Sequence, residues 1–231
     1  DMTIGGIKLA APAPIGNTVM FIAKYTPAGA VLWAKRAPQA RPVAIAPDGA
    51  GGAVIAGGFQ GVAQFGAKSL TNVNFGDVFV ARCDGSGNFL WARSGQASDL
   101  TASNPNASAL GGMDVDHAGT IWLAGRFAQS LNFGGAPMTN RFPVVASQVG
   151  NQLFVARLGL DGSLLWQTNS TNAAAVGFAT VSVVEGTNAL VAGFNGAGTL
   201  SWGSQALAGT NTFVGRIDGN GHPDWLLAGR L

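Results

Sequence analysis

The chain has 231 residues, of which 47% are hydrophobic and only 10% charged, so it can bury a substantial core with far fewer charges than the roughly 25% of ordinary soluble domains. Its net charge of +2 is a small difference between 13 basic and 11 acidic residues, and no basic run is long enough to follow a phosphate backbone, which disfavours nucleic-acid binding. Low charge with 35 glycines favours a secreted or cell-surface bacterial protein, or a packed assembly, over a cytosolic enzyme.

The number of cysteines and the length of the apolar runs exclude further classes of protein. A single cysteine, Cys83, excludes an internal disulfide and any zinc site made of several cysteines. No apolar run reaches the roughly 18 residues of a membrane helix, so we expect no membrane span. The opening residues DMTIGG lack the basic start and apolar core of a signal peptide, so we expect either that export information was removed or that the chain is numbered from inside a longer protein.

Four frames of thirteen residues recur along the chain, each running without a gap from a phenylalanine to a tryptophan. Counted from the phenylalanine, position +3 is always basic, +8 is glycine and +12 is tryptophan. Apolar and polar residues alternate before a turn rich in Gly, Asp, Asn or Pro, and this pattern predicts a β-hairpin. The frames are FIAKYTPAGAVLW (21–33), FVARCDGSGNFLW (79–91), FVARLGLDGSLLW (154–166) and FVGRIDGNGHPDW (213–225).

A second pattern precedes three of the frames. An apolar strand runs into Ala-Gly, and a short stretch then ends in an aromatic residue followed by Gly: AVIAGGFQGVAQFG (53–66), IWLAGRFAQSLNFG (121–134) and ALVAGFNGAGTLSWG (189–203). A further short strand and turn lies before each copy, so one unit contributes about four strands. Because no segment has a helical period, the sequence predicts an all-β protein, a β-propeller of four-stranded antiparallel blades. A stacked β-solenoid is the lesser alternative.

The combined motif of Ala-Gly-x-Phe, aromatic-Gly and Phe-Val-Ala-Arg with Gly-x-x-x-Trp resembles the secreted bacterial β-propeller repeats of the SBBP type. The resemblance covers nearly the whole chain through its repeats. It implies a blade architecture in exported or surface proteins. It implies no family-wide active site.

The repeats predict a single propeller segment over 1–231, with about three and a half blades. We expect a half blade at 1–36, in which Ile4-Gly5 takes the place of Phe65-Gly66, and blades at 37–93, 94–168 and 169–231. A ring needs at least four blades, so we expect an incomplete ring, either a piece of a longer propeller or one completed by a protein partner. Two copies that together make seven blades are arithmetically possible.

Two repeated features suggest chemistry at first sight. Cys83 occupies position +4, which holds Tyr25, Leu158 and Ile217 in the other frames, so packing explains it better than a reactive thiol does. The turn carboxylates resemble calcium loops, but none has the distant bidentate Glu that such a loop needs, so we interpret them as turn residues. These carboxylates belong to Asp84, Asp161 and Asp218.

Position +3 holds the one repeated charge, at Lys24, Arg82, Arg157 and Arg216. With an even hairpin loop, this side chain and the +12 tryptophan would share a sheet face and stack. The alternative is a ring of cations that binds an anionic ligand.

The stretch GMDVDHAG is the most suggestive cluster outside the frames. Asp114 and Asp116 would lie on one strand face with His117 at the turn, and Asp114 could face a cation or a sugar. The alternative is that Asp116 is a turn residue, as Asp48 is in the preceding unit, and that Asp114 is solvated.

These observations favour a non-catalytic, secreted or cell-surface structural module that acts through protein–protein interaction. The runner-up is a carbohydrate-binding propeller, in which a glycan contacts the variable loops at 94–112 and 138–152. An enzyme ranks third, because the chain has no Gly-x-Ser-x-Gly, His-Glu-x-x-His or phosphate loop and only one glutamate, Glu185. We therefore assign no catalytic, cofactor-binding or metal residues.

Overall fold

The protein is an all-β molecule in the computed structural model, which describes residues 1–10, 18–72, 77–98, 108–141, 150–171, 174–184 and 186–229. Within these ranges every strand pair is antiparallel and no helix is present, as the sequence pattern predicts. There is accordingly no helix in the described ranges that could cross a membrane.

Three units of four strands form the body of the molecule, and in each unit the strands pair in chain order. The third and fourth strands are the arms of a thirteen-residue frame. A fourth frame forms the two-stranded sheet of β3 (Val19–Tyr25) and β4 (Val31–Pro38). The units are β5 (Ala40–Pro47), β6 (Ala53–Phe59), β9 (Asp77–Cys83) and β10 (Phe89–Ala97); β11 (Ala109–Val115), β12 (Ile121–Phe127), β15 (Gln152–Leu158) and β16 (Leu164–Asn169); and β17 (Ala174–Val183), β18 (Ala189–Trp202), β20 (Asn211–Ile217) and β21 (Pro223–Gly229).

A short inserted hairpin lies between the second and third strands of each unit, and a matching one precedes β3. Its buried aromatic residue stands before the turn as Phe65, Phe133 or Trp202, and Ile4 takes this place in the first hairpin, also buried. The hairpins are β1 (Met2–Ile4) with β2 (Ile7–Leu9), β7 (Val62–Phe65) with β8 (Lys68–Thr71), β13 (Ser130–Asn132) with β14 (Met138–Thr139), and the end of β18 with β19 (Gln205–Ala208).

Inserted hairpins also connect neighbouring units. Strand β13 pairs with β10 of the preceding unit through Gln96↔Asn132 and Ala97↔Leu131. Strand β10 ends at Ala97, past the blade boundary expected at residue 93. Strand β16 likewise ends at Asn169, one residue past the boundary expected at 168.

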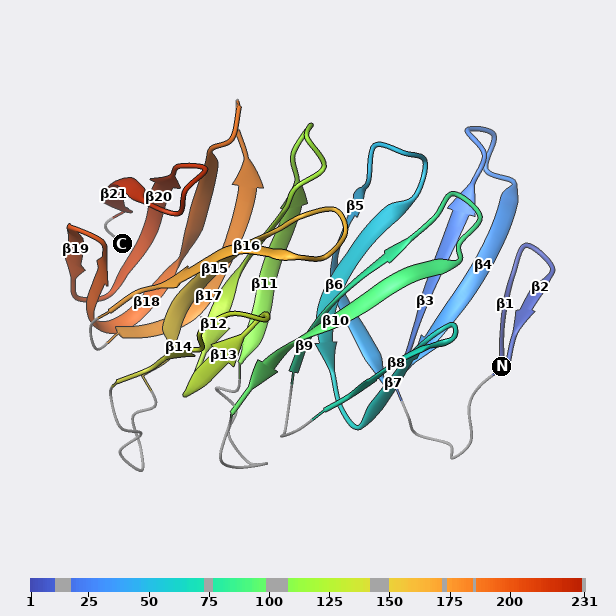
Figure 1. Cartoon of the computed structure of the whole chain (residues 1–231), viewed down its shortest axis with the longest axis horizontal. Helices are drawn as coiled ribbons and strands as arrows, with labels where there is room; N and C mark the ends of the chain where they lie inside the picture. Colours follow the sequence, from blue (N-terminus) through green and yellow to red (C-terminus); the bar gives the residue numbers. More distant parts are fainter. Residues whose placement is uncertain are drawn as a thin grey trace.

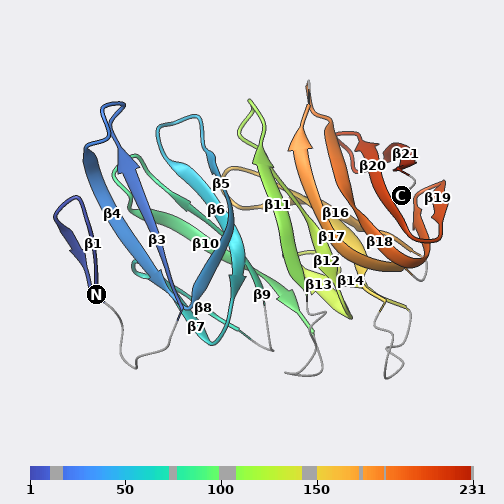
Figure 2. The same ribbon diagram turned by 180° about the vertical axis from the view of Figure 1, so that it is seen from behind.

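The units stand side by side in a row, with the N- and C-terminal sheets at opposite ends of the longest axis (Figure 1). Strands β3, β5, β11 and β17 lie next to one another on one side of the molecule (Figure 2). Each gap between neighbouring units is filled by an apolar cluster, so three clusters hold the row together. The described strands do not close into a ring.

All four frames adopt one hairpin geometry. The amide of the +8 glycine donates to the carbonyl at +5, and the glycine has φ between +80° and +89° in each copy, a conformation that side chains other than glycine's rarely adopt. One residue on the fourth strand, at position +11, is bulged out of the pairing. The bulge brings positions +3 and +12 opposite each other although the loop itself has an odd number of residues.

Burial of the frame phenylalanine depends on its neighbours. Phe154 is 0% exposed and packs on Phe133, with ring centroids 5.8 Å apart, whereas Phe21 at the same position is 47% exposed. We expect Phe154→Ala to lower the free energy of unfolding by about 3–5 kcal/mol, because it leaves a cavity between two sheets. We expect Phe21→Ala to lower it by less than about 1 kcal/mol. Urea denaturation of both variants checks this, and equal losses would contradict the packing described here.

Candidate functional site

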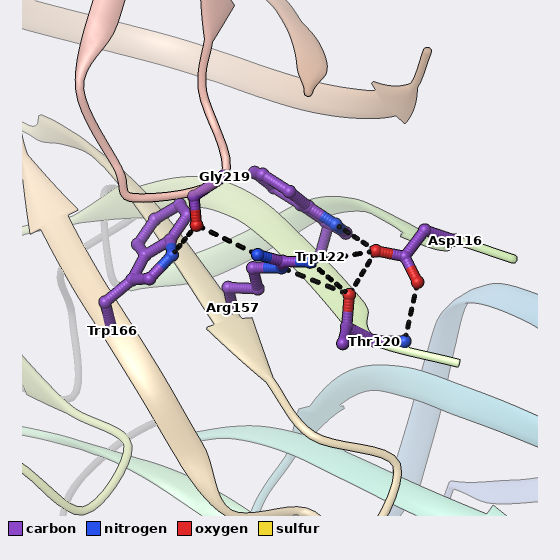
Figure 3. A network of polar contacts seen from close by, with 6 residues as sticks. All are labelled: Asp116, Thr120, Trp122, Arg157, Trp166 and Gly219. Carbon is purple, nitrogen blue, oxygen red and sulfur yellow. Dashed lines mark hydrogen bonds and ion pairs between the residues drawn. The ribbon is translucent and has the colours of Figure 1, made fainter. Parts of the chain in front are cut away.

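The hairpin tip of each unit is bound to the preceding sheet by two side chains that share one carbonyl. At the last junction, Trp166 Nε1 donates to the carbonyl of Gly219 at 2.7 Å and Arg157 Nη1 donates to the same oxygen at 2.9 Å (Figure 3). Gly219 belongs to the turn between β20 and β21. We call this arrangement the junction clamp: the tryptophan at +12 and the basic side chain at +3 of one frame both donate to the backbone carbonyl at +6 of the next frame.

The same clamp occurs at the two earlier junctions. Leu160 offers its carbonyl to Trp91 Nε1 at 3.0 Å and to Arg82 Nη1 at 3.5 Å. In the first junction the Gly85 carbonyl accepts from Trp33 Nε1 at 2.8 Å and from Lys24 Nζ at 3.5 Å. The clamp is therefore a property of the repeat. It explains why position +3 is basic and +12 is tryptophan in the three frames that precede another one.

The +3 and +12 side chains do share a sheet face, since Arg157↔Trp166 and Arg82↔Trp91 are cross-strand partners. The cation–π contact, however, is made with a different ring: the Arg157 guanidinium lies 4.9 Å from the centroid of Trp122 on β12. Trp122 in turn meets Trp166 edge to face at 5.3 Å. The predicted stacking on the +12 ring is replaced by hydrogen bonding that brings both donors to one carbonyl.

A buried carboxylate holds Arg157 in place. Asp116 follows β11 and lies 3.1 Å from Arg157 Nη2, with both side chains almost wholly buried. The same carboxylate accepts hydrogen bonds from the Thr120 amide at 2.8 Å, from the Thr120 hydroxyl, and from Trp122 Nε1 at 3.3 Å (Figure 3). Burial alone would raise the pKa of Asp116, but the hydrogen bonds from Thr120, Trp122 and Arg157 outweigh it and lower the pKa.

The preceding unit repeats this pair. Asp48 lies 2.9 Å from Arg82 Nη2 and also accepts from the amides of Ala50 and Gly52. Burial would raise the pKa of Asp48, yet these hydrogen bonds and the Arg82 charge lower it. Asp48 and Asp116 each lie five residues before a second strand in a unit with an arginine at +3, and this shared spacing is the sequence signal that could have revealed the pair.

The last unit departs from this scheme. Val184 stands where Asp48 and Asp116 stand, as the matching turn hydrogen bonds show. Arg216 instead lies 3.5 Å from Asp224 on the outer strand, with side chains 41% and 39% exposed. Exposed pairs of this kind contribute little to stability.

The three polar residues of GMDVDHAG do not form one site, because each has different surroundings. Asp114 reaches across to the next unit, where its carboxylate accepts from the Val183 amide at 2.8 Å and the Ser182 hydroxyl at 3.3 Å. It is neither simply solvated nor directed at a cation: it bonds two sheets together. Asp116 is the turn residue described above, and His117 is exposed. Among the described residues, no three His, Cys, Asp or Glu side chains gather as a metal site would require.

Cys83 is buried in the cluster between the first two sheets. Burial raises the pKa of its thiol, and the carboxylates of Asp84 and Asp48 raise it further. The thiolate needed for nucleophilic chemistry is therefore disfavoured, in keeping with a packing role.

The three turn carboxylates bind their own backbone. Asp84 accepts from the amides of Ser86 and Asn88, and Asp218 accepts from those of Asn220 and His222, all at 2.8–2.9 Å. Asp161 accepts from both the amide and the hydroxyl of Ser163. This is turn chemistry, with the carboxylate oxygens engaged by nearby donors.

The variable loops considered for glycan binding contain residues 99–107 and 142–149, which lie outside the described residues. The structure therefore adds no contact to that hypothesis.

The two ends of the row present half clamps. At one end, Trp225 Nε1 and Arg216 occupy the donor positions, and no described residue accepts from the indole. At the other end, the turn after β3 has the frame geometry, and no described residue donates to the carbonyl of Pro27 at position +6. We call the outer side of the β3–β4 sheet the head face and the outer side of the β17–β21 sheet the tail face.

Both faces carry exposed apolar side chains. Phe21 and Tyr25 are exposed on the head face, and Phe178 and Leu227 on the tail face. The counterparts of Phe21 and Tyr25 inside the row face a neighbouring sheet: Phe79, Phe154, Cys83 and Leu158 are all buried. Exposed large apolar side chains on the outer side of a sheet can mark an interaction surface.

Comparison with known proteins provides no family for this chain. No protein-family model matches it, and no curated protein matches it either.

The buried carboxylate offers a direct test of the clamp. We expect Asp116→Asn to lower the free energy of unfolding by about 3 kcal/mol, because the guanidinium of Arg157 stays buried without its counter-charge. The matched variant Asp224→Asn removes the partner of an exposed arginine, so its loss should stay below about 1 kcal/mol. Urea denaturation at neutral pH measures both, and a similar effect of the two substitutions would show that the buried network has no special weight.

Acid stability should depend on the same groups. Asp48 and Asp116 have folded pKa values below the unfolded value of 3.8, so the unfolded chain binds protons more tightly. Their contribution is fully present above that value and is lost as the pH falls through the lower folded pKa values. We expect the double variant Asp48→Asn/Asp116→Asn to lose less unfolding free energy than the wild type between pH 5 and pH 3. Parallel slopes in urea titrations at several pH values would contradict this assignment.

Proposed function

We propose that this chain is a non-catalytic structural module that works by end-to-end protein interaction, through sheets that act as blades of a β-propeller. The observation that carries the proposal is the junction clamp: it joins every pair of neighbouring units and is left half-formed on both outer faces. Each outer face carries one half of the junction that joins two units inside the row, so it is suited to bind another unit of the same kind.

Several features support the blade interpretation. Each full unit has four antiparallel strands paired in chain order, and the first strands β5, β11 and β17 lie next to one another. This arrangement is what radially packed sheets require on the side of the axis. Further units of the same kind, or a protein partner, would complete the ring.

The polar groups that could suggest catalysis are engaged in structure. Asp48 and Asp116 hold arginines, Asp114 bonds the next sheet, and the thiol of Cys83 is buried with a raised pKa. A role in binding therefore fits the described residues better than a role in acid–base chemistry does. The low charge and glycine-rich composition support a secreted or cell-surface location for this role.

Hydroxyl-radical footprinting in the cells or medium where the protein is produced tests the proposal. We expect the end-face side chains Phe21, Tyr25, Phe178 and Leu227 to be oxidised several-fold less there than in dilute purified protein. Leu90 and Leu165 provide matched controls, because they are exposed at the bulge position of interior units and should react equally in both settings. Equal oxidation of the end-face residues in both settings would refute the proposed function.

A further inference from the structure

In the part of the chain that the structure describes, strand β3 has an open edge at a place where its three counterparts are paired. In the other frames, β9, β15 and β20 each lie between a second strand on one side and a fourth strand on the other. Within the described residues, β3 pairs with β4 alone. An open strand edge presents unpaired backbone amides and carbonyls, which is the basis of recognition by strand addition.

An apolar hollow runs along this edge. Two adjoining hollows, of about 360 and 290 Å³, lie between β3 and β5 and share Ile22, Ala23 and Ile45. Ile45 is 61% exposed, whereas Met113 and Val181, its counterparts on the first strands of the next two units, are 8% and 5% exposed. The first and second strands of the preceding unit cover Met113 and Val181. The described residues contain no first and second strands before β3, so Ile45 lacks this cover.

The three complete units show how the edge is filled. The first residue of the second strand pairs with position +4 of the frame in every unit: Ala53↔Cys83, Ile121↔Leu158 and Ala189↔Ile217. Seven residues pair without a bulge from there to position −2. On β3 the same register would pair the occupant with residues 19–25, which is the whole strand.

The complete units also show which residues an occupant of this edge needs. The fifth residue of each second strand is a glycine, at Gly57, Gly125 and Gly193, and an added Cβ there would collide with a backbone carbonyl of the adjoining first strand. The residue before this glycine is alanine in all three units, at Ala56, Ala124 and Ala192. Any occupant must therefore be a hairpin whose two strands approach closely and whose second strand carries Ala-Gly at its fourth and fifth positions.

We propose that the open edge of β3 binds a two-stranded β-hairpin of the chain's own first-and-second-strand type, with Ala-Gly at the fourth and fifth positions of its second strand. The occupant pairs antiparallel with Val19–Tyr25 and covers Phe21, Val43 and Ile45. This inference rests on the proposed function, since it names the element that the head face receives. It differs from the general proposal in assigning one edge, one register and one sequence pattern.

A fusion protein tests the assignment. In the complete units the hairpin precedes the inserted hairpin, so a copy of residues 40–61 placed directly before Asp1 reproduces the spacing between β6 and β7. We expect the β3 amides that do not bond to β4 to exchange with solvent at least about tenfold more slowly than in the unfused chain, equivalent to about 1.4 kcal/mol of local stability. Hydrogen exchange followed by NMR measures each amide.

The matched control is the same fusion with Gly57→Val in the added copy alone, which blocks the close approach of its two strands and should leave β3 exchanging as in the unfused chain. Unchanged exchange in a folded wild-type fusion, or equal slowing in the control, overturns the inference. If the fusion does not fold, a synthetic peptide of residues 40–61 added to the unmodified chain decides: saturable slowing on β3 supports the inference, and its absence overturns it. Footprinting of Phe178 and Leu227 on the tail face does not involve the β3 edge, so the two proposals can fail separately.

Discussion

The structure depends on one hydrogen-bonding constraint, which is that at each internal junction the carbonyl at the tip of the frame hairpin is satisfied by the sheet before it. A turn carbonyl next to a sheet interface has no strand partner, so leaving it unpaired there would cost free energy. The tryptophan indole and the basic side chain of the preceding frame both donate to it. The left-handed glycine at +8 fits against the tryptophan ring, as Gly87 does on Trp33.

This constraint makes the molecule a row of nearest-neighbour junctions. Each apolar cluster lies between two units and each clamp joins the same two units, so stability is shared between adjacent sheets as in other repeat proteins. At the ends of the row, the groups that serve as structure inside become surface. Trp225 and Phe21 are ordinary members of their repeat, and only their position at the ends of the row leaves them without a neighbouring sheet among the described residues.

The units differ most in how they hold the +3 arginine. Arg82 and Arg157 are fixed by buried aspartates, which orient the guanidinium toward the next turn. Arg216 faces no such carboxylate, because Val184 stands in its place, and it lies against the exposed Asp224. The guanidinium of Arg216 is therefore less constrained than those of Arg82 and Arg157.

The repeat spacing determined the local structure by itself: the hairpin frames, the tryptophan anchors, the packing role of Cys83 and the place of Ile4 all follow from short-range alternation and turn chemistry. Interactions between units could not be obtained in this way, because they join residues about 50 or more positions apart. The bond from Asp114 to β17 is one of these, because it depends on how two sheets meet. The pairing of Asp116 with Arg157 lies within one unit but joins residues 41 positions apart, so short-range alternation does not reveal it either. A carboxylate in a sequence carries no mark of whether its neighbour in space is water, a cation or an arginine from another strand, so only the tertiary structure decided that.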